Sequence, residues 1–154
     1  VSIIIGYLAG GIIRGLAVAT VVTFIALFFT EINIKNPLMT LFVIIMTAGV
    51  FSLAGLINAI FAKKFDDIAV IPSFVLAPLT YLGGVFYTVS LLPEFWQTLS
   101  RFNPILYMIN SMRYSVIGIS DVSIQNALMM IVVFFILLFA TAVILLKKGI
   151  GIRQ

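Results

Sequence analysis

The sequence contains no cysteine and no histidine. This chain therefore offers no disulfide, no thiolate or imidazole ligand for a metal, and no serine–histidine pair for hydrolysis. It also lacks a phosphate-binding GxxxxGKS or GxxxxGKT run, so it has no P-loop with which to bind ATP. We expect no catalytic residue, no metal site and no cofactor on this chain.

Charged side chains are scarce. They make up 9% of the sequence, against 63% hydrophobic residues, and the mean hydropathy is +1.28. A soluble domain must cover its surface with polar groups, which this composition cannot do, so we predict an integral membrane protein. The net charge of +4 is small, and the basic residues sit at the ends of apolar runs. We interpret them as determinants of topology, not as a nucleic-acid surface.

Four apolar runs are long enough to cross the ~30 Å of a bilayer's hydrocarbon. They cover about residues 3–29, 39–61, 68–90 and 126–146. Two amphipathic segments, about 93–101 and 104–118, are too short to cross and are expected to be re-entrant or interfacial helices. The predicted fold is an all-α integral membrane protein with four transmembrane helices and this short pair between the third and fourth. No Asp or Glu lies in the middle of a predicted span, which argues against a proton-coupled transporter and an intramembrane aspartyl protease.

The stretch from residue 76 to 113 organises the chain. The third predicted span carries Pro72, Pro78 and the Gly83-Gly84 pair, which predict a kinked helix whose freed carbonyls must find partners in the protein. Asn103 is expected to cap the second short helix, with Pro104 in its first turn. That helix has an apolar face of Ile105, Met108, Ile109, Met112 and Val116. Its polar face holds Tyr107, Asn110, Ser111 and Tyr114, and is expected to tolerate water.

Small residues recur at helical spacing in the first two spans. One stripe holds Gly6 and Gly10, another holds Gly11, Gly15 and Ala19, and the second span has Ala48, Ser52, Gly55 and Ala59. Such faces let helix backbones approach closely, so we interpret them as packing surfaces. Asn58 can donate a hydrogen bond across to a neighbouring helix.

Several runs resemble the C-terminal part of ABC-2 type transporter permeases. These runs are PLTYLGGVFY at 78–87, LPEFW at 92–96, NPILY at 103–107 with Arg113-Tyr114, GYLAGGIIRG at 6–15, and FSLAGLIN at 51–58 followed by FAKKFDD at 61–67. The resemblance covers nearly the whole chain and keeps the family's order. It implies that two further spans and a cytoplasmic helix precede Val1 in the intact protein.

The resemblance also implies a function and partners. Such a permease would move a lipid, polysaccharide or drug-like substrate out across the bacterial cytoplasmic (inner) membrane. It would do so as a homodimer in the lipid bilayer, docked on a separate cytoplasmic ATPase subunit that binds ATP and Mg²⁺. The alternative is a passive membrane module, a channel or an anchoring subunit, without ATP coupling. Co-purification of a P-loop ATPase would discriminate between the two.

The distribution of basic residues predicts the orientation. The proposed inner side holds Lys63, Lys64, Lys147, Lys148 and Arg153, and the proposed outer side holds Lys35, Arg101 and Arg113. The C-terminus is then cytoplasmic, and the short helix pair lies outside.

The turn at residues 63–67, on the proposed inner side, is a short loop that could contact an ATPase subunit. Its residues are Lys63, Lys64, Phe65, Asp66 and Asp67. The two adjacent carboxylates could suggest acid–base or metal chemistry. A solvated loop or a cap for the next helix is the favoured interpretation, because no third ligand lies nearby.

Seven residues are candidates for a substrate path or gate. They are Arg14, Tyr81, Phe86, Tyr87, Trp96, Tyr107 and Arg113. The aromatic rings could face a sugar or an apolar drug, or could simply pack and form an interfacial belt. Arg14 lies inside a span, so it either snorkels to an end or faces a partner or polar cavity. Arg113 should find a partner or reach the head groups. The short pair is expected to act as a moving gate over a hydrated exit path.

Overall fold

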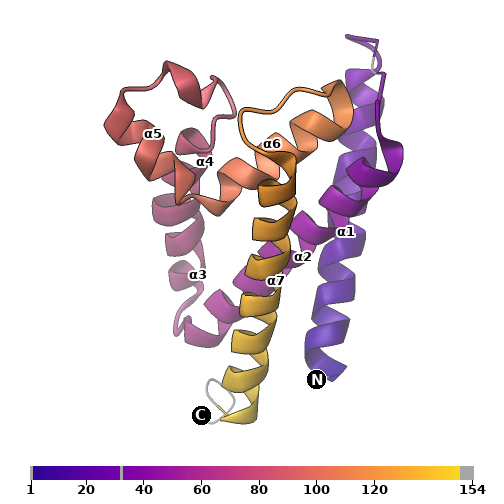
Figure 1. The fold of residues 1–154 in the computed structure, drawn as a ribbon. Helices are drawn as coiled ribbons and strands as arrows, with labels where there is room; N and C mark the ends of the chain where they lie inside the picture. Colours follow the sequence, from indigo (N-terminus) through magenta and orange to yellow (C-terminus); the bar gives the residue numbers. More distant parts are fainter. Residues whose placement is uncertain (1, 32, 150–154) are drawn as a thin grey trace.

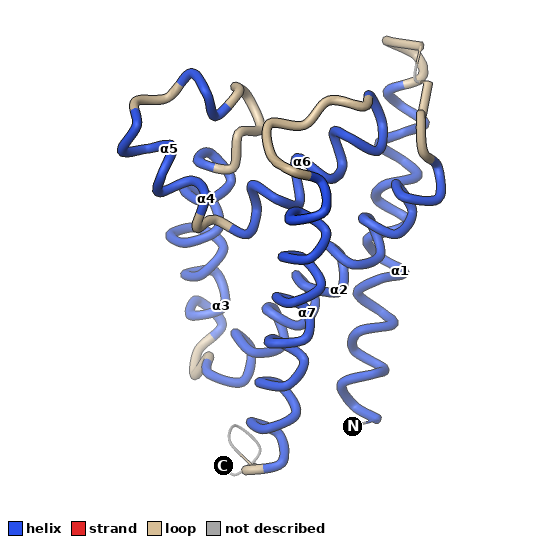
Figure 2. Tube along the Cα trace, viewed as in Figure 1, coloured by secondary structure: helices blue, strands red, loops and turns tan. Residues whose placement is uncertain are grey.

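The computed structural model describes residues 2–31 and 33–149, with only the backbone of Phe65. Arg153, one of the predicted inner cations, lies outside these residues. The elements are α1 (Ser2–Ala26), α2 (Pro37–Phe61), α3 (Phe65–Ile71), the π-helical turn η1 (Pro72–Leu76), α4 (Ala77–Leu82), the 3₁₀ turn η2 (Val89–Leu91), α5 (Glu94–Arg101), α6 (Pro104–Ile117) and α7 (Ile124–Lys147). Throughout this described part the secondary structure is helical, without a strand (Figure 2). The all-α class is confirmed.

Three helices, α1, α2 and α7, are long and apolar enough to cross a membrane. The run expected as the third of four spans, 68–90, is helical only as far as Leu82 and is divided into α3, η1 and α4. The helix ends because Gly84 adopts a left-handed conformation with φ of 77°. Glycine takes up this conformation without strain and commonly terminates helices. The predicted end at residue 90 is therefore wrong, since residues 83–88 form a turn and η2 follows.

The break in this helical run begins at Pro72, where η1 starts. Proline has no N–H, so the carbonyl of Ile68, four residues earlier, loses its usual helical partner. The side chain of Asn58 supplies one instead, with Nδ2 donating to the Ile68 carbonyl oxygen at 2.9 Å. The predicted cross-helix hydrogen bond of Asn58 is confirmed, and it satisfies the carbonyl that the proline frees.

Figure 1 shows that the chain runs repeatedly between two ends of the molecule. The start of α1, the turn between α2 and α3, and the end of α7 lie at one end. The loop from α1 to α2, helix α5 and the loop from α6 to α7 lie at the other (Figure 1). Helix α6 crosses obliquely near this second end. The two ends correspond to the inner and outer groups of loops in the predicted topology.

Helix α2 is the centre of the packing, in contact with α1, α6 and α7. One apolar cluster joins Ile4 of α1, Leu53 and Leu56 of α2, and Ala142 of α7. A second joins Val50, Met108 and Ile131, and so connects α2, α6 and α7. Much of the surface of α1 and α7 remains exposed and apolar, as expected for helices surrounded by lipid or by other apolar helices.

The contact between α1 and α2 is made through small residues. A β-carbon built on Gly15 would lie 2.6 Å from Cβ of Ala48, and one on Gly11 would overlap the side chain of Ser52. The predicted close approach of these two faces is confirmed. Gly6 and Gly10 have nothing within 4 Å, so their stripe does not take part in this contact.

Candidate functional site

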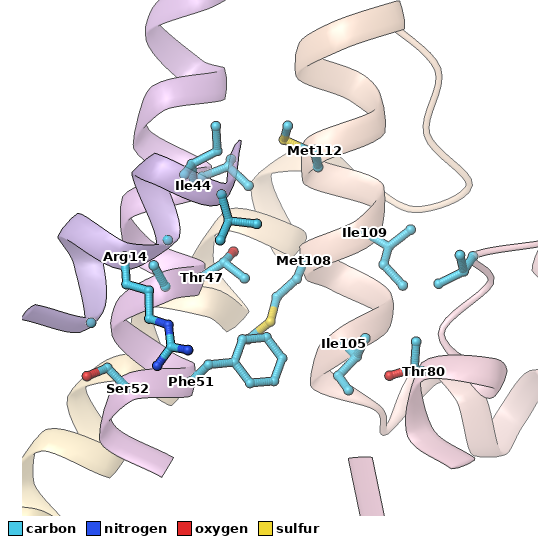
Figure 3. Close-up of a pocket in the computed structure, with 16 residues that line it drawn as sticks. Arg14, Ile44, Thr47, Phe51, Ser52, Thr80, Ile105, Met108, Ile109 and Met112 are labelled. Carbon is cyan, nitrogen blue, oxygen red and sulfur yellow. The ribbon is translucent and has the colours of Figure 1, made fainter. Parts of the chain in front are cut away.

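A cavity of about 670 Å³ lies between α1, α2, α4 and α6 (Figure 3). Its lining is almost wholly apolar, with only a few hydroxyls and one charged side chain. Helix α6 contributes the apolar side chains Ile105, Met108, Ile109 and Met112. Helix α1 contributes the small residues Gly11 and Gly15 to the lining. The same close helix contact that fixes α1 therefore also forms one edge of the cavity.

Arg14 is the charged side chain, and α1 is the element that places it here. Figure 3 shows its guanidinium group turned into the cavity. Within residues 2–31 and 33–149, no hydrogen bond or ion pair to this group is formed. Figure 3 also shows the side chain extending from α1 to the level of Phe51 and Ser52. The cavity beside it is apolar and the described residues offer it no partner, so both expectations for Arg14, an extension toward a helix end and a partner or polar cavity, stay predictions.

Helix α6 has the two faces expected from its sequence, but their surroundings differ from the expectation. The apolar face lines the cavity, whereas Asn110, Ser111 and Ser115 are buried. Asn110 Oδ1 accepts a hydrogen bond from the Asp121 backbone N–H at 2.8 Å and from the Ser120 hydroxyl at 3.3 Å. The expectation of a polar face open to water is wrong for Asn110 and Ser111, which are buried, and the loop between α6 and α7 covers Asn110.

Asn103 joins the beginning of α6 to the end of α4. Its Oδ1 accepts from the Ile105 backbone N–H at 3.0 Å, which confirms the predicted N-cap. Its Nδ2 donates to the carbonyl oxygen of Leu79 in the last turn of α4. Carbonyls at a helix end lack helical partners, so one amide satisfies groups at two helix termini.

Arg113 forms an ion pair, the first of the two outcomes expected for its charge, a partner or the head groups. Its Nη1 lies 3.0 Å from Oδ2 of Asp121, and its Nη2 donates to the Gly84 carbonyl oxygen at 2.7 Å. The two charged side chains are 21% and 16% exposed, so this pair is partly shielded from solvent. Asp121 was not among the residues expected to matter. The sequence signal that could have found it is its place as the acidic residue in the short loop after α6.

The aromatic candidates do not line the cavity. Tyr81 and Phe86 are 63% and 77% exposed. The hydroxyl of Tyr87 donates to the carbonyl of Tyr81 at 2.6 Å, and that of Tyr107 donates to the carbonyl of Arg101 at 2.7 Å. The Trp96 ring packs edge-on against Phe95. Of the seven residues grouped by sequence, the cavity thus includes only Arg14, and a gate role for the others stays a prediction.

The turn between α2 and α3 lies at the opposite end from α5 (Figure 1). Oδ2 of Asp67 accepts hydrogen bonds from the backbone N–H groups of Lys63 at 3.0 Å and Lys64 at 2.9 Å. Asp67 therefore caps this turn, as the favoured interpretation predicted. The charged groups of Lys63, Lys64 and Asp66 are exposed and available to a partner. Contact with an ATPase stays a prediction.

Residues 1–117 match the family model of the ABC-2 type transporter. The chain belongs to this family. The resemblance found in the sequence is thereby confirmed.

Curated relatives of this ABC-2 chain carry a more specific name. Proteins called inner membrane transport permease YadH, from Escherichia coli strain K12 and from Shigella flexneri, are each 48% identical over 152 residues. The alignment covers 99% of this chain and 59% of each relative. The chain thus spans about three fifths of the length of the curated relatives it matches. The comparison with solved structures found no match to this chain.

Proposed function

We propose that the chain forms part of a permease that exports a lipid, polysaccharide or drug-like substrate across a bacterial inner membrane. The observation that carries this proposal is the family match over residues 1–117. The name of the relatives supports the inner-membrane location, and the three long apolar helices support residence in a bilayer. Energy would come from a separate ATPase subunit that binds ATP and Mg²⁺.

The two ends of the molecule suggest where its partners bind. The end that holds the 63–67 turn also holds Lys147 and Lys148, and the positive-inside rule makes it the cytoplasmic end. The ATPase would dock there on Lys63, Lys64, Phe65, Asp66 and Asp67. The C-terminus would then be cytoplasmic. A second copy of the permease and the lipid bilayer would cover the exposed apolar faces of α1 and α7.

The other end would be the exit. The proposed gate there comprises the short helices α5 and α6, with Tyr81, Phe86, Tyr87, Trp96, Tyr107 and Arg113 around them. Helix α6 lines one side of the cavity that holds Arg14, so movement of α6 would also change the cavity. Movement of α6 would have to break the contacts of Arg113 or carry the 83–84 turn along.

The test uses the full-length protein with its copurifying partner. We expect a P-loop ATPase to copurify, and ATP to drive transport in inside-out vesicles only when that ATPase is active. Replacing Lys63 and Lys64 together by Glu should release the ATPase, while the matched change Arg101→Glu at the opposite end should not. If no ATPase copurifies and transport proceeds without ATP, the alternative of a passive membrane module is the correct one.

A further inference from the structure

We propose that the cavity between α1, α2 and α6 binds an amphipathic anion. The negative head group would pair with Arg14, and the apolar chain would lie along α2 and α6. The use of such a ligand in transport rests on the proposed function. Its binding does not, because binding needs neither ATP nor a second subunit.

The charge of Arg14 is the first reason. Arg14 is the thirteenth of the 25 residues of α1, so it stands at the middle of a helix that is long enough to span a membrane. A cation at that depth is costly without a counter-charge. None of the described residues that line the cavity is acidic. An anion from outside the described chain would supply the missing charge, and guanidinium groups bind carboxylates and phosphates with paired hydrogen bonds.

The lining offers few other polar groups. Thr47 contributes to it from α2. Its hydroxyl oxygen has no hydrogen-bond partner among the described residues, but other atoms of the protein cover it, so it does not face the space for a ligand. The other lining hydroxyls, of Ser52 and Thr80, already donate to backbone carbonyls.

The remaining lining excludes some ligands by its chemistry. Met108 and Met112 provide flexible, polarizable side chains that adapt to an apolar chain of variable shape. The volume of about 670 Å³ falls among typical small-molecule sites. A sugar polymer would need stacking faces and many hydrogen-bonding groups, whereas Phe51 is the aromatic residue here. The site therefore favours an anionic lipid or drug-like amphiphile over a polysaccharide.

An apolar helix of a second copy or of the longer protein is the rival occupant. Such a helix could fill the apolar space but would leave the guanidinium of Arg14 without a counter-charge. Charge complementarity therefore favours the amphipathic anion. The two occupants also differ in a measurable way, because a helix that fills the cavity would exclude every small ligand.

Dodecyl phosphate is a suitable probe, with binding to the full-length protein in neutral detergent measured by native mass spectrometry. We expect one probe to bind, and the cation dodecyltrimethylammonium to bind at least about tenfold more weakly. Arg14→Gln should weaken dodecyl phosphate binding by at least about tenfold, and Arg14→Lys should retain most of it. The matched control Arg101→Gln, a cation outside the cavity, should bind as the wild type does.

Two arms complete the experiment. Met112→Trp, which fills the cavity without changing charge, should also reduce binding, so the test survives if Arg14→Gln fails to fold. Competition by phosphatidylglycerol would identify the natural ligand as a bilayer lipid. Its absence would identify a free amphiphile, and either result supports an anionic ligand. Equal binding of the anion and the cation, unchanged binding by Arg14→Gln, or no binding to folded wild type would overturn the proposal. None of these readouts depends on ATP, so a failure here leaves the proposed export function to its own test.

Discussion

Helices α1 and α6 both pack against α2, yet different chemistry attaches each of them. Helix α1 has one buried residue, Ile4, and meets α2 through Gly11 and Gly15. Helix α6 has six buried residues. Its N-cap Asn103 and its side chains Asn110 and Arg113 also form hydrogen bonds to α4, to the loop before α7 and to the 83–84 turn.

This difference matters because helices in a bilayer gain little from hydrophobic burial against one another, and depend on close packing and hydrogen bonds. The contact of α1 with α2 depends mainly on shape, with one hydrogen bond from the Ser52 hydroxyl to the Tyr7 carbonyl, whereas α6 is held by several directional bonds. We therefore expect α6 to move only together with α4 and the 83–84 turn when it acts as the proposed gate, and α1 to separate more readily from α2. The two walls of the cavity would then differ in how they are held.

The largest effect is expected from Gly11→Leu. The added side chain would overlap Ser52 and force α1 away from α2, at a cost of about 3 kcal/mol of unfolding free energy. Gly10→Leu is the matched control, because nothing lies within 4 Å of Gly10. Denaturation of the full-length protein in detergent would measure both. Equal stability of the two variants would mean that α1 is not held through this face.

Asn103→Ala should have the next largest effect. It removes the N-cap of α6 and leaves the Leu79 carbonyl without its partner, which should lower the unfolding free energy by about 2 kcal/mol. Gln97→Ala offers a control. The Gln97 amide also donates to a backbone carbonyl, that of Leu92, but this carbonyl lies just before α5 and does not connect α6 to another helix. A loss no greater than that of the control would contradict the view that polar contacts fix α6.

Arg113→Ala should cost about 1–2 kcal/mol, because the pair with Asp121 is partly exposed. We further expect it to lower substrate-stimulated ATP hydrolysis in the reconstituted complex, with expression and ATPase docking intact. Arg101→Ala is the control for loss of a cation at the same end of the molecule. If Arg113→Ala left ATP hydrolysis unchanged, the claim that α6 governs turnover would be wrong.

Asp121→Asn should have the smallest effect, below about 1 kcal/mol. It removes the ion pair but keeps the bond from Arg113 Nη2 to the Gly84 carbonyl and the backbone bond from Asp121 to Asn110. A loss as large as that of Arg113→Ala would show that the ion pair, not the bond to the 83–84 turn, holds α6. The same denaturation assay compares the two variants directly.

Features of the fold that depend on local sequence were predictable. The cap at Asn103 followed by Pro104, and the small-residue spacing in α1 and α2, each express a rule that acts within one helix or one helix pair. The end of the third apolar run was missed because Gly83-Gly84 was interpreted as a weak point within a helix. A glycine after an apolar run also ends helices, and hydropathy alone cannot distinguish the two.

Features of the site that depend on tertiary contacts were not predictable to the same degree. The cavity arises where α1, α2 and α6 meet, and no spacing within one helix specifies which of their faces enclose it. Sequence singled out Arg14 because a charge within a span is unusual. It also grouped the aromatic residues near α5 with Arg14, although none of them lines the cavity.

The central claim is that the molecule has a cytoplasmic end at the 63–67 turn and an outer end at α5. Two variants, Lys64→Cys and Thr98→Cys, test it most directly. Each carries one cysteine in a full-length protein that has no other. An impermeant thiol reagent is added to spheroplasts. We predict labelling of position 98 in intact spheroplasts, and labelling of position 64 only after the membrane is permeabilised. Labelling of position 64 but not 98 in intact spheroplasts would contradict the orientation, and with it the proposed ATPase contact and exit.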